Sequence, residues 1–452
     1  MGPGGVFEEL VIKENTMESA PPNYLKRYDD EPEETKFALL RKFMAEDPLG
    51  LFKELRAERP VLVSPKCTLI ALYDDVIEML NMPKVFTAAL YVPKMANGYF
   101  MMHDDDALHY REKSIMQGLL NRDDLPQVRN MVGQICKDLL SAADGKIDAV
   151  GGYCRLVPAT IVRDYFGLIG MERKDLMEWS YWAQVDTFYN QPFDIVTPEE
   201  RQSITDSHNA SAEKLGKYIE ALILTRGLAL KLGVFLLPFK KLWRMVNRKK
   251  DGGLQDDIVA RMLRTKFPQE VDFDVKRVGV NAAGLLIGTI ETTAQASVQA
   301  IQFLLDHPEL LIQAQNAAAA DDPVVFDSIV WEALRFVPIS PYMFRQTACE
   351  YTIAKGTDRQ TTIAPMTNVL ALTQSAMFDE KAFEYPEEFR PERNWYHYFT
   401  FGYGEHECLG KYIGMVMIPE MVRQILRVPG LKADGEILYD GHMPKSFALT
   451  WP

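Results

Sequence analysis

The sequence contains no long apolar run, no closely spaced cysteine pair and no excess of positive charge. No segment is apolar over the roughly 18 consecutive residues that a membrane-spanning helix needs, and the N-terminal stretch lacks the apolar core of a signal peptide. The five cysteines lie far apart, which fits a reducing compartment and not a disulfide framework. The formal net charge of −13 would repel the phosphates of a nucleic acid. These absences favour a cytoplasmic globular protein that binds no nucleic acid.

The chain also lacks internal repeats, low-complexity tracts and an obvious linker between domains. Of its 452 residues, 47% are hydrophobic and 25% are charged, which is ordinary for a globular protein. We therefore expect a partly flexible N-terminal arm, residues 1–34, followed by a single domain. That domain would span residues 35–452. We also expect the protein to be a monomer.

Helical patterns dominate the chain, and strand patterns are short. Residues 82–103 show no clean period and read as a long loop rich in apolar side chains, which is typical of binding segments. The sequence thus predicts a mainly α fold with small β-sheets. We expect helices at 35–58 (broken at Pro48), 74–81, through most of 108–221 and at 272–306, and short strands at 60–73, 350–372 and 431–451.

Residues 222–250 form an unusual segment whose first half is apolar and whose second half is rich in cations. An amphipathic basic helix of this kind can rest on an anionic membrane surface. The alternative, which we favour, is a solvated insertion that packs on its own domain. The cations are Lys240, Lys241, Arg244, Arg248, Lys249 and Lys250.

The stretch FTFGYGEHECLGKY, residues 399–412, places the lone Cys408 on a glycine-rich bend before an apolar, helix-like run. A helix N-terminus favours the thiolate form of cysteine, which is both a nucleophile and a metal ligand. A zinc site would need more ligands than the nearby His406. The pattern leaves open a nucleophile with His406 as its base, an axial ligand of haem iron, and a cysteine that merely packs.

The same stretch resembles the haem-binding signature of the cytochrome P450 superfamily. FGYGEHECLG matches the signature at each of its fixed positions, which are Phe401, Gly404, His406, Cys408 and Gly410. The resemblance implies a cytochrome P450 fold, a triangular helical prism that holds heme b (iron protoporphyrin IX) between a long distal helix and the cysteine-loop helix. It implies that Cys408 is the metal ligand, with Phe401, Gly402 and Gly410 around the cofactor.

Further motifs occur in the order that this family requires. WEALRFVP resembles the E-x-x-R helix, with Glu332 and Arg335 one turn apart, so that they can pair on one helix face. The resemblance implies that an arginine before the cysteine loop completes this network, and Arg393 is our choice over Arg390.

The segment LLIGTIETTAQASVQAI, residues 285–301, resembles the distal helix of the family. Glu291 and Thr292 stand where the family has its acid–alcohol pair, which implies that they deliver protons during oxygen activation. Thr289 departs from the family pattern, which usually has a glycine there.

The resemblance also assigns cations to the two haem propionates. His109 and Lys113 occupy the family's His-x-x-x-Arg positions, with Arg111 as a rival donor. Arg345 and His406 occupy the remaining propionate positions. Cations suit these positions because buried carboxylates need partners.

The resemblance implies a haem-thiolate monooxygenase that inserts one atom of O2 into a hydrophobic substrate, by hydroxylation or epoxidation. Because no reductase segment follows, we expect electrons from a separate ferredoxin or flavodoxin with its reductase, docking near Lys411. The alternatives are a peroxide-dependent or hydroperoxide-rearranging haem-thiolate enzyme, and a haem sensor or carrier. The expected pocket is apolar and partly aromatic, lined by Leu90, Tyr91, Tyr99, Phe100, Met101, Leu286, Thr289, Tyr342, Met343 and Phe344.

Overall fold

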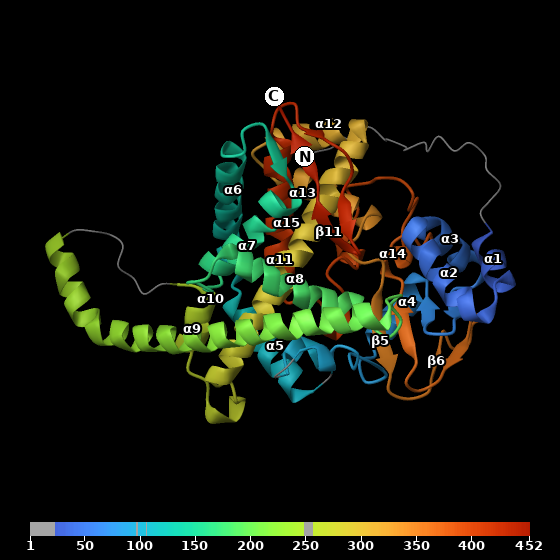
Figure 1. Cartoon of the computed structure of the whole chain (residues 1–452), viewed down its shortest axis with the longest axis horizontal. Helices are drawn as coiled ribbons and strands as arrows, with labels where there is room; N and C mark the ends of the chain where they lie inside the picture. Colours follow the sequence, from blue (N-terminus) through green and yellow to red (C-terminus); the bar gives the residue numbers. More distant parts are fainter. Residues whose placement is uncertain (1–22, 96–97, 105, 248–255) are drawn as a thin grey trace, which may run out of the picture. The chain divides into compact units, whose positions relative to one another are not determined.

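The computed structural model describes residues 23–95, 98–104, 106–247 and 256–452. The described chain forms two compact units, each made of two separate stretches of sequence. The first unit combines the chain up to Thr87 with Asp321–Glu407, and the second combines Ala88–Ala320 with Cys408–Pro452. Helices make up most of the regular structure and the sheets are small, so the predicted mainly α fold is confirmed (Figure 1).

The first unit places short helices beside a small mixed sheet. Its helices are α1 (Tyr24–Asp30), α2 (Glu33–Glu46), α3 (Pro48–Glu58), α4 (Tyr73–Leu80), α13 (Val324–Phe336) and α14 (Thr373–Ala376). Its strands are β1 (Val61–Val63), β2 (Thr68–Ile70), β3 (Phe86–Thr87), β5 (Met343–Thr347), β6 (Tyr351–Ile353), β7 (Thr361–Ile363) and β8 (Asn368–Ala371). Short 3-10 turns cover Trp395–His397 and Gly404–His406.

The larger sheet of this unit has the order β1-β2-β8-β5-β3, with β2 parallel to β8 and the other neighbours antiparallel. Its register sets Arg345 on β5 opposite Val369 on β8. Strands β6 and β7 form a separate antiparallel pair. The predicted helix over 35–58 does break at Pro48, because Asp47 caps α3 by accepting a hydrogen bond from the Gly50 amide at 3.0 Å.

The second unit is a bundle of helices with short strands. Its helices are α5 (Ala107–Leu119), α6 (Leu125–Ser141), α7 (Leu156–Asp164), α8 (Arg173–Tyr189), α9 (Pro198–Asn247), α10 (Ile258–Arg264), α11 (Val275–Asp306), α12 (Pro308–Ala319) and α15 (Lys411–Leu426). Its strands are β4 (Lys146–Asp148), β9 (Lys432–Ala433), β10 (Leu438–Asp440), β11 (Met443–Ser446) and β12 (Ala448–Thr450). Single helical turns cover Val92–Lys94, Phe100–Met102, Arg122–Asp124, Val150–Cys154 and Gln269–Val271.

Helix α11 is the centre of the second unit. It packs against α7, α8, α9, α12 and α15 (Figure 1). It buries most of its apolar side chains. Asp274 fixes its start, since its side chain accepts a hydrogen bond from the Arg277 amide at 2.9 Å. The long helix predicted over 272–306 is confirmed. None of the helices within the described ranges is long and apolar enough to cross a membrane.

The structure describes only part of two segments that the sequence analysis singled out. Of the arm over 1–34, residues 1–22 lie outside the described chain, whereas residues 24–30 form α1 and bury Tyr24, Leu25 and Tyr28. The segment 222–250 continues α9 as one helix up to Asn247, with Leu224 and Leu228 exposed. Of its cations, Arg248, Lys249 and Lys250 lie outside the described residues, and the side chains of residues 230–247 are not described.

Candidate functional site

Cys408 lies in the second unit, immediately before α15, and its side chain is exposed. The Lys411 amide donates to the Cys408 carbonyl at 3.3 Å, which continues the bend into the first turn of the helix. A Cβ atom on Gly410 would lie 3.8 Å from the Cys408 sulfur, so the backbone passes close to it. The sulfur therefore stands at the N-terminus of a 16-residue helix, where amide groups favour a thiolate.

Helix α11 has an exposed point in the middle of an otherwise buried stretch. Gly288 is exposed and Thr289 half-buried, whereas Leu286, Ile287 and Ile290 are buried. A Cβ atom on Gly288 would meet no atom within 4 Å, so the space beside this turn is open. Because α11 and α15 pack together within one unit, the exposed turn and the exposed sulfur belong to the same bundle.

Thr292 binds the backbone at this exposed point. Its hydroxyl donates to the Gly288 carbonyl at 2.7 Å, one turn earlier in the helix. The carbonyl therefore shares its lone pairs between the helix and the Thr292 side chain. Thr289, which stands where the family has glycine, does not prevent this contact.

Glu291 is fully buried and forms an ion pair that the sequence did not reveal. Its Oε2 accepts from Arg155 Nε at 2.9 Å, and Arg155 also donates to the Pro444 carbonyl at 3.0 Å. Its other oxygen, Oε1, has no hydrogen-bond partner among the described residues. Burial raises the pKa of the Glu291 carboxyl, while Arg155 opposes the rise. Glu291 can therefore hold or release a proton close to Thr292.

His109 is buried near the start of α5. Its ring nitrogen Nδ1 lies 3.0 Å from the Phe100 carbonyl oxygen, and its amide donates to the capping Asp106 at 2.7 Å. Lys113 follows one turn later and shares its face of the helix. Arg111, the rival donor, pairs instead with Asp272 at 3.8 Å.

Glu112 ties α5 to α11, and no sequence motif pointed to it. The carboxylate is fully buried, and Arg277 forms an ion pair with it, with Nη2 at 2.7 Å from Oε2. Asn281 donates to the same oxygen at 2.8 Å. These contacts fix the helix that carries His109 against the helix that carries Glu291.

The expected pocket residues of the second unit pack on α8 and α11. The Tyr99 ring lies so close to Gly284 that a Cβ there would come within 2.3 Å of it. The Tyr91 ring meets Phe188 of α8 edge-on, with centroids 5.7 Å apart. Leu90, Phe100 and Leu286 are buried, whereas Met101 and Thr289 are half-buried.

In the first unit, glycines shape the loop that precedes the cysteine. Gly402 and Gly404 have φ angles of 78° and 68°, in the left-handed region that favours glycine. A Cβ on Gly404 would lie 2.9 Å from the Leu80 carbonyl oxygen, so only glycine fits there. Phe401 packs on Trp331 of α13, with ring centroids 5.4 Å apart. The loop is therefore held by backbone shape and aromatic packing.

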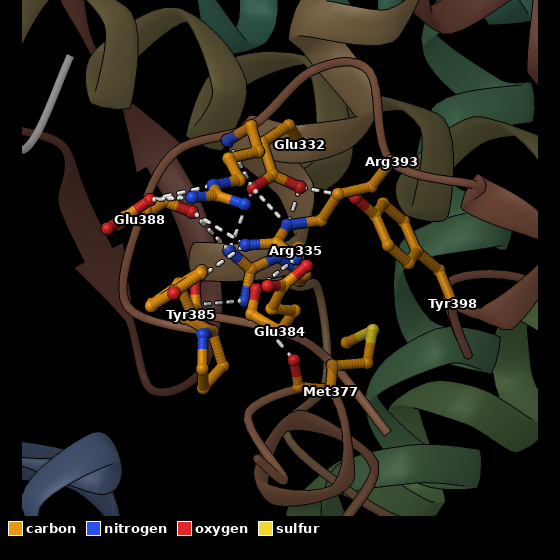
Figure 2. A network of polar contacts seen from close by, with 10 residues as sticks. Glu332, Arg335, Met377, Glu384, Tyr385, Glu388, Arg393 and Tyr398 are labelled. Atoms are coloured by element: carbon orange, nitrogen blue, oxygen red, sulfur yellow. Dashed lines mark hydrogen bonds and ion pairs between the residues drawn. The ribbon is translucent and has the colours of Figure 1, made fainter. Parts of the chain in front are cut away.

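The first unit also brings Glu332, Arg335 and Arg393 together (Figure 2). The Glu332–Arg335 pair is fully buried and bidentate, with distances of 2.8 and 3.0 Å. Arg393 Nε lies 3.5 Å from Glu332 Oε1, and the guanidinium donates to the carbonyls of Glu384 and Tyr385 at 2.7 and 2.6 Å. The guanidinium groups thus fasten the segment before the cysteine loop to α13.

Two further residues join this network. Arg390 gives Glu332 only its backbone amide, at 2.9 Å, and its side chain pairs with Glu388. The Tyr398 hydroxyl donates to Glu332, and burial followed by the Glu332 charge raises the pKa of this tyrosine (Figure 2). Tyr398 was missed in the sequence because no motif marks it.

The remaining predicted residues of the first unit lie on β5 or near it. Arg345 is buried and donates to the Phe344 carbonyl at 2.8 Å. The Tyr342 hydroxyl accepts from Arg41 at 2.9 Å. Met343 would meet a Cβ on Gly402 at 3.5 Å, and His406 is half-buried in the loop. The predicted residues thus form one set within each unit.

Comparison with known proteins gives consistent matches. A family model described as Cytochrome P450 matches residues 240–428. Erythromycin C-12 hydroxylase from Saccharopolyspora erythraea is 27% identical over 313 residues, which cover 69% of this chain and 68% of the relative. Steroid C26-monooxygenase from Mycolicibacterium smegmatis is 23% identical over 386 residues, which cover 84% of this chain and 85% of the relative.

The fold is also found among solved structures. Cytochrome P450 CYP109Q5 from Chondromyces apiculatus superposes with a TM-score of 0.69 at 19% identity. The superposition covers 90% of this chain and 96% of that chain. At this identity the likeness shows the fold.

Proposed function

Because this chain belongs to the cytochrome P450 superfamily of haem-dependent monooxygenases, we propose that Cys408 is the thiolate ligand of its haem iron. The monooxygenase prediction is confirmed over the peroxide-dependent alternative, since the relatives are hydroxylases, monooxygenases and epoxidases. The chain is thus an oxidoreductase that acts on a hydrophobic substrate and takes electrons from a redox partner. The structural matches support a single domain over residues 35–452.

The single observation that carries the proposal is the exposed Cys408 thiol at the N-terminus of α15, in the same bundle as the open turn at Gly288. A residue that served only for packing would be buried, as Cys136 and Cys154 are. The residues present therefore fit a haem, and we propose heme b. When bound, it supplies the activation of O2 for transfer of one oxygen atom to a C–H or C=C bond.

Further haem contacts are proposed from the resemblance. In the second unit, His109 and Lys113 share one face of α5 and supply cations or hydrogen bonds for a propionate. Gly410 lets the backbone pass close to the sulfur. In the first unit, the resemblance assigns Phe401 and Gly402 to the cofactor loop and Arg345 and His406 to the propionates.

Glu291 and Thr292 are proposed to handle protons beside the open turn. Thr292 holds its hydroxyl on the Gly288 carbonyl, so its position is fixed. Glu291 can carry a proton because burial raises the pKa of its carboxyl, and its Oε1 is the oxygen not engaged by Arg155. Arg155 keeps this carboxyl oriented by pairing with Oε2.

For the redox partner we propose a ferredoxin or flavodoxin with its reductase. The chain itself carries a net charge of −13, so docking of an acidic partner would need a local cationic surface. Lys411 follows Cys408 closely in the chain, and in the same unit Arg122 stacks on the Tyr412 ring with its guanidinium 3.7 Å from the centroid. Lys411→Glu should slow reduction of the haem, and the difference from the wild-type rate should grow as the salt concentration is lowered. The control is Lys217→Glu, which changes an exposed lysine of α9. An unchanged reduction rate would move the docking surface elsewhere.

The substrate is proposed to be a bulky hydrophobic molecule, such as a terpenoid, steroid, macrolide or fatty acid. The apolar and aromatic side chains of 84–103 and of Leu285–Thr289 support this class. So do the names of the relatives, which act on erythromycin and on a steroid. We propose that the protein is cytoplasmic, in keeping with five widely spaced cysteines, and that it is a monomer. A peripheral membrane contact at 222–250 is a separate proposal that rests on composition alone.

A Soret titration of the purified ferric protein tests the function. The panel holds fatty acids, terpenes, steroids, macrolides, small aromatics and one fatty-acid hydroperoxide. We expect a shift of the haem iron from low to high spin with one class of apolar compound. Product formation should then require O2 and a reduced redox partner. Rapid consumption of the hydroperoxide without any reductant, and no spin shift, would contradict monooxygenation.

A further inference from the structure

Helix α8 carries a buried stripe of polar side chains beside two segments that the sequence predicts to line an apolar pocket. Ser180, Gln184 and Thr187 are 0%, 4% and 0% exposed, and their spacing places them on one face of the helix. Gln191, just beyond the end of the helix, is 1% exposed. Buried polar groups are normally hydrogen-bonded, so each of these needs a partner.

The two ends of the stripe touch the two predicted pocket walls of this unit. The Ser180 hydroxyl donates to the Ile287 carbonyl of α11 at 3.5 Å, between Leu286 and Gly288 in the chain. Gln191 Nε2 donates to the Leu90 carbonyl at 3.5 Å, in the apolar loop. Gln184 and Thr187 lie between these anchor points along the helix.

The middle of the stripe has polar atoms without partners. Gln184 Oε1 and Thr187 Oγ1 are buried and form no hydrogen bond with any described residue. This is unusual for a helical threonine. The hydroxyls of Thr160, Thr225 and Thr292 all donate to the carbonyl four residues earlier, at 2.7, 2.8 and 2.7 Å.

We propose that Gln184 and Thr187 bind a hydroxyl group on an otherwise hydrophobic substrate, an inference that rests on the proposed function. The Gln184 oxygen can only accept, so it needs a donor, and the Thr187 hydroxyl can donate in return. An alcohol satisfies both atoms at once, whereas a carboxylate cannot donate to Gln184 and a hydrocarbon leaves both unpaired. A carboxylate would also need a cation, and Lys94 is already paired with Asp186 on the adjacent face of α8.

This contact would anchor one end of the substrate at α8. The apolar remainder would then extend along α11 toward the open turn at Gly288. A site built to bind a hydroxyl discriminates strongly against the analogue that lacks it, because its own polar groups are left unpaired. The two side chains would thus set both which molecule binds and which carbon faces the site.

The test uses matched pairs of one carbon skeleton with and without a hydroxyl: dodecan-1-ol and dodecane, cyclododecanol and cyclododecane, borneol and bornane. Soret titration of the holoprotein measures each Kd. We expect at least one alcohol to bind about ten-fold more tightly than its hydrocarbon, and the preference to shrink below about two-fold in the Gln184→Met/Thr187→Val double variant. Hydrocarbon affinity should stay unchanged.

Thr160→Val is the matched control, because Thr160 is a buried helical threonine whose hydroxyl is fully bonded, to the Leu156 carbonyl and to Arg173. It should lower the Tm and keep the alcohol preference. The double variant should keep or raise the Tm without substrate, since it removes unpaired polar atoms.

The inference is overturned if no pair shows a preference, as would occur if ordered water alone occupies the stripe. It is also overturned if the preference survives in the double variant, or if that variant loses as much Tm as Thr160→Val. Each of these leaves the thiolate spectrum of the carbon monoxide complex intact. Loss of that spectrum in the wild type contradicts the proposed function itself, and this inference with it.

Discussion

The cysteines of the second unit differ in burial, and burial decides what each can do. Cys136 is fully buried, and desolvation raises the pKa of its thiol to about 12, so it remains a neutral packing group. Cys408 is exposed at a helix N-terminus, where backbone amides stabilise negative charge. The same residue type thus packs at one position and presents its sulfur at the other.

Glu291 gives a pH-dependent prediction at this scale. Burial raises the pKa of its carboxyl in the folded protein above the ordinary 4.5, so the folded state binds its proton more tightly than the unfolded state does. As pH rises from 4.5 through the raised pKa, the wild type should lose unfolding free energy relative to Glu291→Gln. Urea denaturation of both proteins across this window measures the difference.

The sign of that difference is the test. Below pH 4.5 the carboxyl is protonated in both states, and the gap between the two proteins should be constant. A gap that stays constant at higher pH would show that Arg155 cancels the effect of burial on the pKa of Glu291. A gap that changes in favour of the wild type would show that Arg155 dominates and lowers that pKa.

At the scale of elements, buried ion pairs join segments that are distant in sequence. Glu112 on α5 pairs with Arg277 on α11, and Glu332 on α13 pairs with Arg335 and with the segment around Arg393. Losing one member leaves a buried charge without its partner, which costs far more than losing an exposed pair.

Glu112→Ala should therefore destabilise the second unit by about 3–5 kcal/mol, because Arg277 would keep a buried positive charge. Chemical denaturation measures the loss. The matched control is Glu213→Ala on α9, whose exposed pair with Lys217 at 2.6 Å should contribute nothing measurable. Equal effects in the two variants would contradict the structural role of the α5–α11 contact.

Tyr398→Phe tests the network of the first unit. It removes the hydroxyl that donates to the buried Glu332 carboxylate, and we expect a loss of about 1.5–3 kcal/mol in unfolding free energy. Tyr396→Phe is the control, since Tyr396 is 63% exposed. If both variants unfold at the same urea concentration as the wild type, Tyr398 does not stabilise the network.

At the scale of the whole molecule, local patterns were predictable and distant pairings were not. The cysteine loop is contiguous, and the left-handed φ angles of Gly402 and Gly404 account for glycine at these two positions. Helix α11 could be predicted because its apolar pattern is long. Arg155 and Glu291 are separated by 136 positions, and Glu112 and Arg277 by 165, so no spacing rule could join them.

Two features of the chain could not be predicted for a different reason. The stripe of Gln184 and Thr187 has no sequence signature, because polar residues on an amphipathic helix ordinarily face solvent. The length of α9 was also missed, since a basic, apolar segment after residue 221 looked like a separate insertion, yet the helix continues for 50 residues. Both outcomes depend on what packs beside a helix, not on the helix itself.

The central claim is that Cys408 ligates the haem iron, and the spectrum of the reduced carbon monoxide complex tests it most directly. The wild type should give the red-shifted Soret band of a thiolate ligand, and so should Cys349→Ala, which removes the other exposed cysteine. Cys408→Ala should lose that band, whether or not haem still binds. A thiolate-type band that persists in Cys408→Ala would contradict the account.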